Sequence, residues 1–161
     1  MNKVINVALI GCGRVAGHHA RSIENIPDYA NLVSVCDLID DRRNELGKTH
    51  NVPTYNNYFE MLEKHPEIDV VSIITPSGMH YEHASDVIVN YKKHVIIEKP
   101  MFMTLGQGEE LKQKAHNSGV EIFPVFQYRF NKAVQKIRET CNNNELGKIF
   151  LATVRTRWCR P

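Results

Sequence analysis

Short apolar runs alternate with segments of helical periodicity along most of the chain, and this alternation limits the possible folds more than any other feature. The expected strands cover residues 4–10, 32–36, 52–55, 69–74, 94–97 and 120–125. The expected helices cover residues 14–26, 40–47, 58–64, 80–90, 105–117 and 132–142. The strands are continuous apolar runs, which is typical of strands that are buried on both faces. The pattern predicts an α/β fold with a doubly wound parallel sheet and right-handed crossovers.

Helix ends are marked by capping residues and by glycine or proline. We expect Asp40 or Asp41 to cap the second helix, Gly47 to end it, and Asn131 to cap the last one. Capping-box spacing occurs in two pairs, Asn57 with Glu60 and Thr104 with Gln107. These signals fix where the helices begin and end more closely than periodicity alone.

The last part of the sequence departs from this alternation. Residues 148–158 form the longest strand-like run, in which Thr153, Arg155 and Arg157 occupy alternate positions. No crossover helix follows it before Pro161. We therefore expect one domain over residues 1–147 and, over residues 148–161, the first strand of a truncated second α+β domain.

The composition is that of a globular protein with one sizeable core. The chain has 161 residues, of which 42% are hydrophobic and 24% are charged, and this length is too short for two full domains. The net charge is +2, and no stripe of basic and aromatic residues suggests a nucleic-acid partner. No apolar window approaches the roughly 20 residues that span a membrane, so we expect no membrane partner.

The spacing of cysteine and histidine argues against a metal site. The four cysteines include no Cys-x-x-Cys pair, and we interpret them as reduced thiols of a cytoplasmic protein. The pairs His18/His19 and His80/His83 lack carboxylate or cysteine neighbours at a ligand spacing. We therefore expect no bound metal.

A glycine-rich loop joins the first expected strand to the first expected helix. Its sequence, Gly11-Cys12-Gly13-Arg14-Val15-Ala16, matches the G-x-G-x-x-G/A fingerprint in the required strand–turn–helix context. Gly11 permits the tight turn, Gly13 lets the backbone approach a pyrophosphate, and Ala16 allows close helix packing. The amides of Arg14 and Val15 would donate to the phosphates. The loop predicts a dinucleotide site in a Rossmann-like fold, and a glycine turn without a ligand is the alternative.

Asp37 ends the second expected strand, about two dozen residues after Gly13. A carboxylate at this place accepts hydrogen bonds from the adenosine ribose and repels a 2′-phosphate. The sequence therefore favours NAD over NADP as cofactor. Arg42 and Arg43 leave the alternative open, because an arginine there could fold toward a phosphate.

The loop Thr75-Pro76-Ser77-Gly78 leaves the fourth expected strand at the same edge of the sheet. Each of its positions has turn chemistry, so the simplest interpretation is an ordinary turn. Its amides and hydroxyls could also bracket the pyrophosphate or the nicotinamide-side ribose. Placed opposite the glycine loop, it becomes a candidate cofactor contact.

The fifth expected strand is apolar until it runs into Glu98-Lys99-Pro100. A surface ion pair at a strand end is the simplest interpretation, and such a pair contributes little energy. If the glycine loop holds the phosphates, this strand end would lie beside the nicotinamide. Lys99 would then bind a substrate hydroxyl and assist its deprotonation, while Glu98 would contact the ribose or orient the lysine.

Four spaced motifs resemble those of the Gfo/Idh/MocA oxidoreductases: Gly-x-Gly-x-x-Ala, a strand-end Asp, Thr-Pro-Ser-Gly-x-His and His-Val-x-x-Glu-Lys-Pro. The resemblance covers residues 4–158 and implies NAD(P)-dependent oxidation of sugars or cyclitols, with Lys99 as the catalytic residue. The cofactor-binding residues that follow from the motifs and the resemblance are Gly11, Gly13, Arg14, Val15, Asp37, Thr75, Pro76, Ser77, His80, Glu98, Lys99 and Gln127.

A closer resemblance is carried by the segments 127–134 and 154–161. They are similar to bacterial dehydrogenases that oxidise C3 of UDP-2-acetamido-2-deoxy-glucuronate during surface-polysaccharide synthesis. Arginines between Arg155 and Arg160 could meet an anionic sugar nucleotide or form a solvated strand face. The family's second domain supplies a further catalytic histidine, and no residue here matches it. The resemblance implies a small-molecule substrate and a homo-oligomeric full-length protein. The alternatives are another sugar or cyclitol as substrate and a non-catalytic NAD(H)-sensing module.

Overall fold

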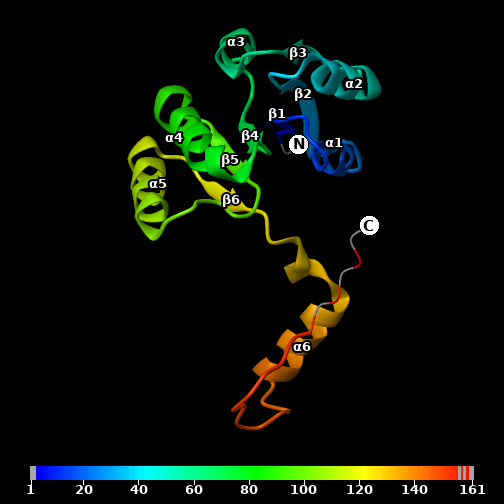
Figure 1. Cartoon of the computed structure of the whole chain (residues 1–161), viewed down its shortest axis with the longest axis vertical. Helices are drawn as coiled ribbons and strands as arrows, with labels where there is room; N and C mark the ends of the chain where they lie inside the picture. Colours follow the sequence, from blue (N-terminus) through cyan, green and yellow to red (C-terminus); the bar gives the residue numbers. More distant parts are fainter. Residues whose placement is uncertain (1–2, 156, 158, 160–161) are drawn as a thin grey trace. The chain divides into compact units, whose positions relative to one another are not determined.

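The computed structural model describes residues 3–155, 157 and 159. It divides into two compact units between Val125 and Phe126. The first unit contains all the strands that were expected before residue 126, and the second contains the last helix (Figure 1).

The first unit is built on a six-stranded parallel sheet with the strand order β3-β2-β1-β4-β5-β6. The strands are β1 (Ile5–Ile10), β2 (Ala30–Cys36), β3 (Thr54–Tyr55), β4 (Val70–Ile73), β5 (His94–Ile97) and β6 (Ile122–Pro124). The predicted doubly wound parallel sheet is confirmed. The order reverses direction between β1 and β4, which is where open sheets of this kind bind ligands.

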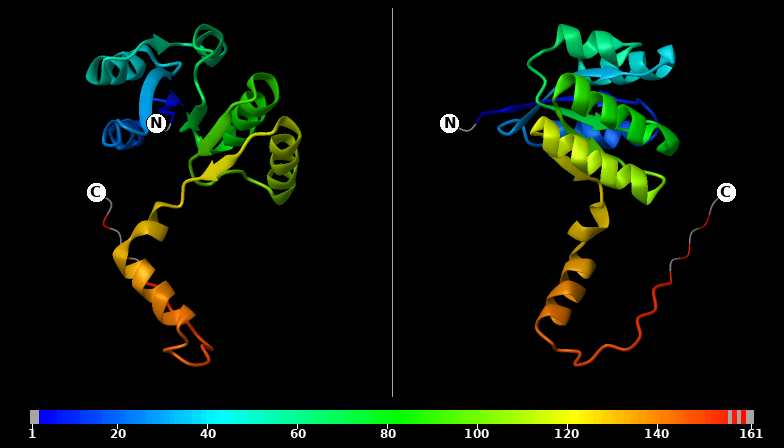
Figure 2. Two further views of the ribbon diagram at one scale, coloured as in Figure 1. Left: turned by 180° about the vertical axis from the view of Figure 1, so that it is seen from behind. Right: turned by 90° about the vertical axis from the view of Figure 1, so that its left-hand side faces the viewer.

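Helices cover both faces of this sheet (Figure 1). They are α1 (Ala16–Glu24), α2 (Asp40–His50), α3 (Tyr58–Lys64), α4 (His80–Tyr91) and α5 (Leu105–Ser118). The helices α1 and α2 pack on one face and α3, α4 and α5 on the other, with α4 and α5 side by side (Figure 2). Among the residues that the structure describes, no helix is both long and apolar enough to pass through a membrane.

The core consists of one apolar layer on each side of the sheet. On the α4 side, Ala84, Val87 and Ile88 are fully buried, as helical spacing predicted. Only three polar side chains fall in the buried class among the described residues: Ser34, Ser72 and His80. Two of these three, Ser72 and His80, lie close to the candidate site described below.

The second helix differs from its prediction at both ends. Ile39 is the N-cap, and the expected caps Asp40 and Asp41 lie in the first turn, where their charges favour the helix N-terminus. Gly47 lies inside the helix, which continues to His50. A Cβ on Gly47 would stand 2.1 Å from the Thr54 methyl group, so glycine serves close packing against β3 rather than helix termination.

The other caps agree with the sequence in most details. Thr104 and Gln107 form a complete capping box at α5, and Gly119 follows this helix in the left-handed conformation. Asn57 caps α3 through the Phe59 amide, but Glu60 pairs with Lys64.

The second unit contains the 3-10 turn η2 (Gln127–Phe130) and α6 (Lys132–Asn142), with Asn131 as the predicted cap. The strand expected over residues 148–158 does not form in its described part, where no residue pairs with a strand. Its alternating sequence is that of a strand, but a strand is stable only with a ladder partner. Thr156, Trp158, Arg160 and Pro161 lie outside the described residues, and a second domain from residue 148 stays a prediction.

Candidate functional site

A cleft of about 960 Å³ opens at the carboxyl ends of β1, β2 and β4. Its walls come from the glycine loop, from the segment after β2, from the segment before α3 and from the loop after β4. Seven of the predicted cofactor-binding residues line it: Gly11, Gly13, Arg14, Val15, Asp37, Thr75 and Pro76. The structure therefore brings together side chains that lie up to 65 positions apart, between Gly11 and Pro76.

Gly11 makes the turn out of β1 and lets two strands approach closely. Its φ is +101°, a conformation that favours glycine. A Cβ at this position would lie 2.7 Å from the Ile74 carbonyl carbon and 2.9 Å from the Thr75 amide nitrogen. The protein's own packing therefore requires glycine here.

Gly13 differs, because a Cβ there would meet nothing within 4 Å. The space above it belongs to the cleft. The amides of Arg14 and Val15 find no acceptor in the part of the chain that the structure describes. Ala16 behind them is fully buried. Open space, free amides and the start of α1 together fit a pyrophosphate.

Asp37 is fixed by the loop that it faces. One carboxylate oxygen accepts a hydrogen bond from the Cys12 amide at 2.7 Å, and the other accepts from the Ile39 amide at 2.8 Å. The carboxylate lines the cleft with lone pairs left for ribose hydroxyls.

Of the two arginines that left NADP open, only Arg42 lines the cleft. Arg43 donates to the carbonyls of Asp37 and Leu38, at 3.3 and 3.4 Å, and pairs with Asp40. Arg43 is therefore occupied in holding the segment after β2.

The loop cysteine is not a reactive thiol. Burial, followed by the charge of Asp37, raises the pKa of Cys12 to about 12. The same causes raise the pKa of Cys36 to about 12. Both thiols stay protonated at neutral pH, and Cys12 donates weakly to the Cys36 carbonyl.

After β4, Thr75 and Pro76 line the cleft, whereas Ser77 lies in the 3-10 turn η1 (Ser77–Met79) outside it. The Thr75 hydroxyl lies 3.0 Å from Nδ1 of His83, which also lines the cleft. Burial lowers the pKa of His83, so its ring is held neutral. A cofactor contact by Ser77 stays a prediction.

His80, a predicted cofactor contact, lies buried between two loops. Its side chain is 1% exposed, and its two ring nitrogens each lie 2.7 Å from a carbonyl oxygen, that of Thr75 and that of Pro100. Neither nitrogen is free for a ligand. The ring ties the loop after β4 to the loop after β5, and cofactor binding by His80 stays a prediction.

Glu98 and Lys99 follow β5 at the same sheet edge but do not line the cleft. The Glu98 amide donates to the Ile73 carbonyl at 3.1 Å, which fixes it beside β4. Its carboxylate contacts His19 Nε2 at 3.1 Å with one oxygen and accepts from the Lys99 amide at 3.1 Å with the other. This geometry favours the interpretation that Glu98 orients the lysine. Lys99 is exposed, and its peptide bond to Pro100 is cis.

Sequence reasoning missed several residues that line the cleft. They include Leu38, Ile39, Asn56, Asn57, Tyr58, Phe59, Met79 and His83. Leu38 directly follows Asp37, and this adjacency was the one available signal; the structure shows that its side chain is 79% exposed. Tyr58 and His83 carried none, because they meet only in the fold, with ring centroids 5.3 Å apart. Gln127 lies in the second unit, and its cofactor contact stays a prediction.

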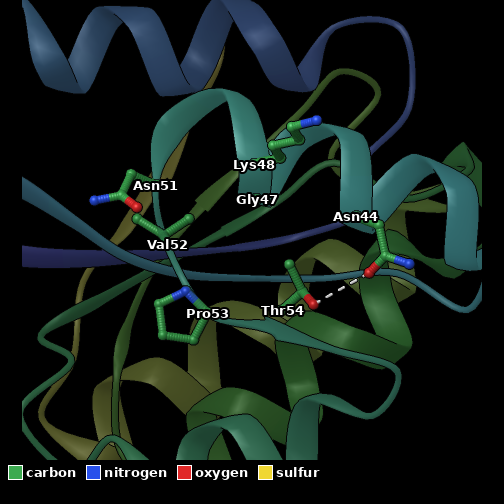
Figure 3. A pocket seen from close by; sticks show the side chains of 7 residues that line it. All are labelled: Asn44, Gly47, Lys48, Asn51, Val52, Pro53 and Thr54. Carbon is green, nitrogen blue, oxygen red and sulfur yellow. Dashed lines mark hydrogen bonds between the residues drawn. The ribbon is translucent and has the colours of Figure 1, made fainter.

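A second hollow lies between α2 and the segment that follows it. It is lined by residues that include Asn44, Lys48, Asn51 and Thr54 (Figure 3). The Thr54 hydroxyl donates to the Asn44 side chain across it at 3.4 Å. Lys48 is the one charged residue in its lining. No second charged group lies beside Lys48 in this lining to activate it, and we assign no chemistry to the hollow.

Comparison with known proteins agrees with this geometry. Residues 5–126 match the family model GFO_IDH_MocA, described as an oxidoreductase family with an NAD-binding Rossmann fold. D-glucoside 3-dehydrogenase of Escherichia coli is 32% identical over 94% of this chain and 43% of its own length. Myo-inositol 2-dehydrogenase of Thermotoga maritima is 27% identical over 95% of this chain and 45% of its own length. The chain thus spans about half the length of the curated relatives that it matches.

Among solved structures, the WlbA dehydrogenase from Bordetella pertussis in complex with NADH and UDP-GlcNAcA is similar, with a TM-score of 0.87. It is 28% identical, and the match covers 92% of this chain and 45% of that one. The family match covers the whole sheet and every lining residue of the cleft. The chain therefore belongs to the Gfo/Idh/MocA oxidoreductase family, in which it forms the NAD-binding Rossmann domain.

Proposed function

We propose that this chain is the cofactor-binding part of a dehydrogenase that oxidises a secondary hydroxyl of a sugar or cyclitol to a ketone. The observation that carries the proposal is the difference between two glycines. The protein's packing requires Gly11, whereas Gly13 faces open cleft beside two free amides. Space that the fold leaves empty beside unsatisfied donors is what a pyrophosphate requires.

The lining residues have distinct tasks in this proposal. Arg14 and Val15 bind the pyrophosphate through their amides, and Asp37 accepts from the adenosine ribose. Leu38 and Met79, which are exposed by 79% and 37%, offer apolar surface to the adenine. Thr75 and Pro76 close the opposite wall beside Gly11.

Lys99 is the proposed catalytic residue. It lies at the end of β5, next to β4, whose end lines the cleft. Bound NAD supplies the acceptor for the hydride that leaves the carbinol carbon. Lys99 in its neutral amine form binds the substrate hydroxyl and takes up its proton as the hydride leaves. As the ammonium it then stabilises the charge that develops on the oxygen. Glu98, the acidic group next to Lys99, is directed to His19 and to the Lys99 amide, so we expect dinucleotide binding with little turnover from these residues alone.

For the substrate, we propose a UDP-linked N-acetylglucosaminuronate oxidised at C3. The support is the similarity to the WlbA structure, whose complex contains UDP-GlcNAcA. The relatives that are named as inositol and glucoside dehydrogenases support the broader class of sugars and cyclitols. A cytoplasmic location and a homo-oligomeric full-length protein remain our predictions.

The cofactor proposal is tested by calorimetric titration of this chain with NAD, NADH, NADP and NADPH. We expect NADH to bind more tightly than NADPH. The Asp37→Ser variant should lose at least about tenfold in NADH affinity, since hydrogen bonds to a charged group contribute about 1.5–3 kcal/mol.

Asp40→Ser is the matched control, because Asp40 lies nearby, is 74% exposed and does not line the cleft. Its NADH affinity should stay within about twofold of the unsubstituted chain, since an exposed pair contributes little. Tighter binding of NADPH by the unsubstituted chain would overturn the assignment of Asp37.

The substrate proposal is tested with the full-length protein. Production of NADH is followed with UDP-GlcNAcA, myo-inositol and glucosides as substrates. We expect Lys99→Ala to abolish most of the kcat while NAD affinity changes little, because Lys99 lies outside the cleft. A rate that is unaltered in this variant would remove Lys99 from the mechanism.

A further inference from the structure

A small polar network lies at the end of β5, among side chains that are otherwise apolar. Ser72 is the one polar residue of β4 and is 1% exposed. Its hydroxyl lies 3.0 Å from Nδ1 of His19, on α1. The Nε2 of His19 lies 3.1 Å from Glu98. Burying polar groups costs free energy unless they are bonded, so each member requires the next.

The direction of these bonds follows from the chemistry of the groups. The Glu98 carboxylate can only accept, so Nε2 of His19 carries the proton and donates. In the neutral ring with this tautomer, Nδ1 carries a lone pair and accepts from the Ser72 hydroxyl. The side chains of His19 and Glu98 are 15% and 13% exposed, so little water competes for either.

Serine, histidine and glutamate in this order also form the catalytic triad of some hydrolases. That interpretation fails here, because the Ser72 hydroxyl lies inside the central sheet, where no substrate reaches it. The network therefore fixes the positions of its side chains, and Ser72 does not act as a nucleophile.

We propose that His19 is a positioning residue for Lys99. His19 holds the Glu98 carboxylate away from the lysine ammonium and directs the second oxygen of this carboxylate to the Lys99 amide. Glu98 and Lys99 are neighbours in sequence and carry opposite charges. His19 binds one carboxylate oxygen, and the Lys99 amide donates to the other at 3.1 Å. Each oxygen keeps a further lone pair, but the two bonds fix the direction of the carboxylate, and in the described part of the chain Glu98 pairs with His19 and not with Lys99. The Lys99 Nζ therefore stays free for a hydroxyl ligand.

The consequence for catalysis rests on the proposed function, but the positioning itself does not. It is therefore tested on the lysine directly, in this chain. The rate at which an amine-reactive reagent labels Lys99 is measured by mass spectrometry and normalised to the exposed Lys48. Hydrogen exchange of the Lys99 amide is followed in parallel.

The variants separate the two contacts of His19. His19→Leu removes both, and His19→Asn keeps an acceptor near Ser72 but does not reach Glu98. His19→Gln restores an N–H near the position of Nε2. The double variant His19→Leu/Glu98→Gln removes the carboxylate that His19 controls.

We expect labelling of Lys99 to slow by about twofold to fivefold in His19→Leu and His19→Asn, the range that an exposed ion pair can produce. Exchange of the Lys99 amide should accelerate in the same variants. Labelling should recover in His19→Gln and in the double variant. If His19→Leu does not fold, His19→Asn alone decides the outcome.

Unchanged labelling in His19→Asn, or slow labelling that persists in the double variant, would overturn the proposal. NADH titration of the same variants keeps the two hypotheses apart, because none of these residues lines the cleft. If the unsubstituted chain did not bind NADH, the proposed function would be contradicted, but the labelling result would remain valid.

Discussion

The glycine loop and the end of β5 lie at the same edge of the sheet, but different kinds of bonds hold them. Around the glycine loop, the decisive contacts are made by main-chain atoms: the turn at Gly11, the Cys12 amide on Asp37 and the Ile74 carbonyl against the loop. At the end of β5, side chains from distant elements meet. His19 contacts Glu98 across 79 positions of sequence, and His80 bridges two carbonyls.

The difference teaches how each region tolerates substitution. A main-chain site depends on residues that have no side chain or a very small one, so damage comes from adding atoms. A side-chain network depends on donors and acceptors that satisfy one another, so damage comes from removing them. We therefore expect added atoms to do the damage around the glycine loop, and lost donors or acceptors to do it at the end of β5.

Adding a side chain at Gly11 should give the largest effect. In Gly11→Val the new Cβ meets the Ile74 backbone at 2.7 Å, and φ is +101°. Strain of this kind costs about 1–3 kcal/mol, and overpacking costs a similar amount. We therefore expect the free energy of unfolding to fall by about 3 kcal/mol or more. Urea denaturation measures this change. A loss below about 1 kcal/mol would show that β1 and β4 can separate without penalty.

Removing the bridge at His80 should give the next largest effect. In His80→Leu the carbonyls of Thr75 and Pro100 lose the ring nitrogens that lie 2.7 Å from each of them inside the fold. A neutral ring donates to one of the two carbonyls, and an unsatisfied buried group costs about 1–3 kcal/mol, so we expect a loss of about 1–3 kcal/mol in the free energy of unfolding. The matched control is His116→Leu near the end of α5, which should change stability by less than about 0.5 kcal/mol. Equal losses in the two variants would show that His80 is not a bridge.

The sequence was a good guide to the glycine loop and a poor one to the end of β5. The sheet, its parallel direction and the position of Asp37 follow from apolar runs and from one motif, because these features depend on residues close together in sequence. Gly47 misled the prediction of the end of α2, since a glycine required for packing against Thr54 looks the same as a helix terminator.

The network at the end of β5 could not be predicted, because its partners are set by the crossing of α1, β4 and β5. His80 shows the same limit. Its motif suggested a cofactor contact, but the fold places both ring nitrogens against carbonyl oxygens. A side chain's partners become known only when the strand order is known, whereas a glycine's turn can be inferred from its neighbours.

Adding a side chain at Gly13 separates binding from folding. A Cβ there meets nothing within 4 Å, so Gly13→Val should fold nearly as well as the unsubstituted chain. The same side chain would occupy the space of the pyrophosphate, and we expect NADH affinity to fall at least about tenfold, which corresponds to about 1.4 kcal/mol. Calorimetric titration together with thermal melting measures both quantities. NADH binding that survives in Gly13→Val would place the phosphates elsewhere.

The smallest expected effect is a pH dependence that comes from His83, which lies in the cleft wall. Burial lowers the pKa of this histidine in the folded chain below its ordinary value of about 6.5. Between the lowered pKa and about 6.5, the unfolded chain binds a proton that the folded chain does not, so stability falls as the pH falls through this range. Above about pH 6.5 both states are neutral, and the full stability is present.

His83→Gln should remove this part of the pH dependence of stability, as measured by urea denaturation between pH 5 and pH 7.5. Since the Thr75 hydroxyl lies against Nδ1, the neutral ring also keeps the wall of the cleft intact. NADH affinity should therefore decline only where the pH falls below the lowered pKa of the folded chain, and it should do so in the unsubstituted chain but not in the variant.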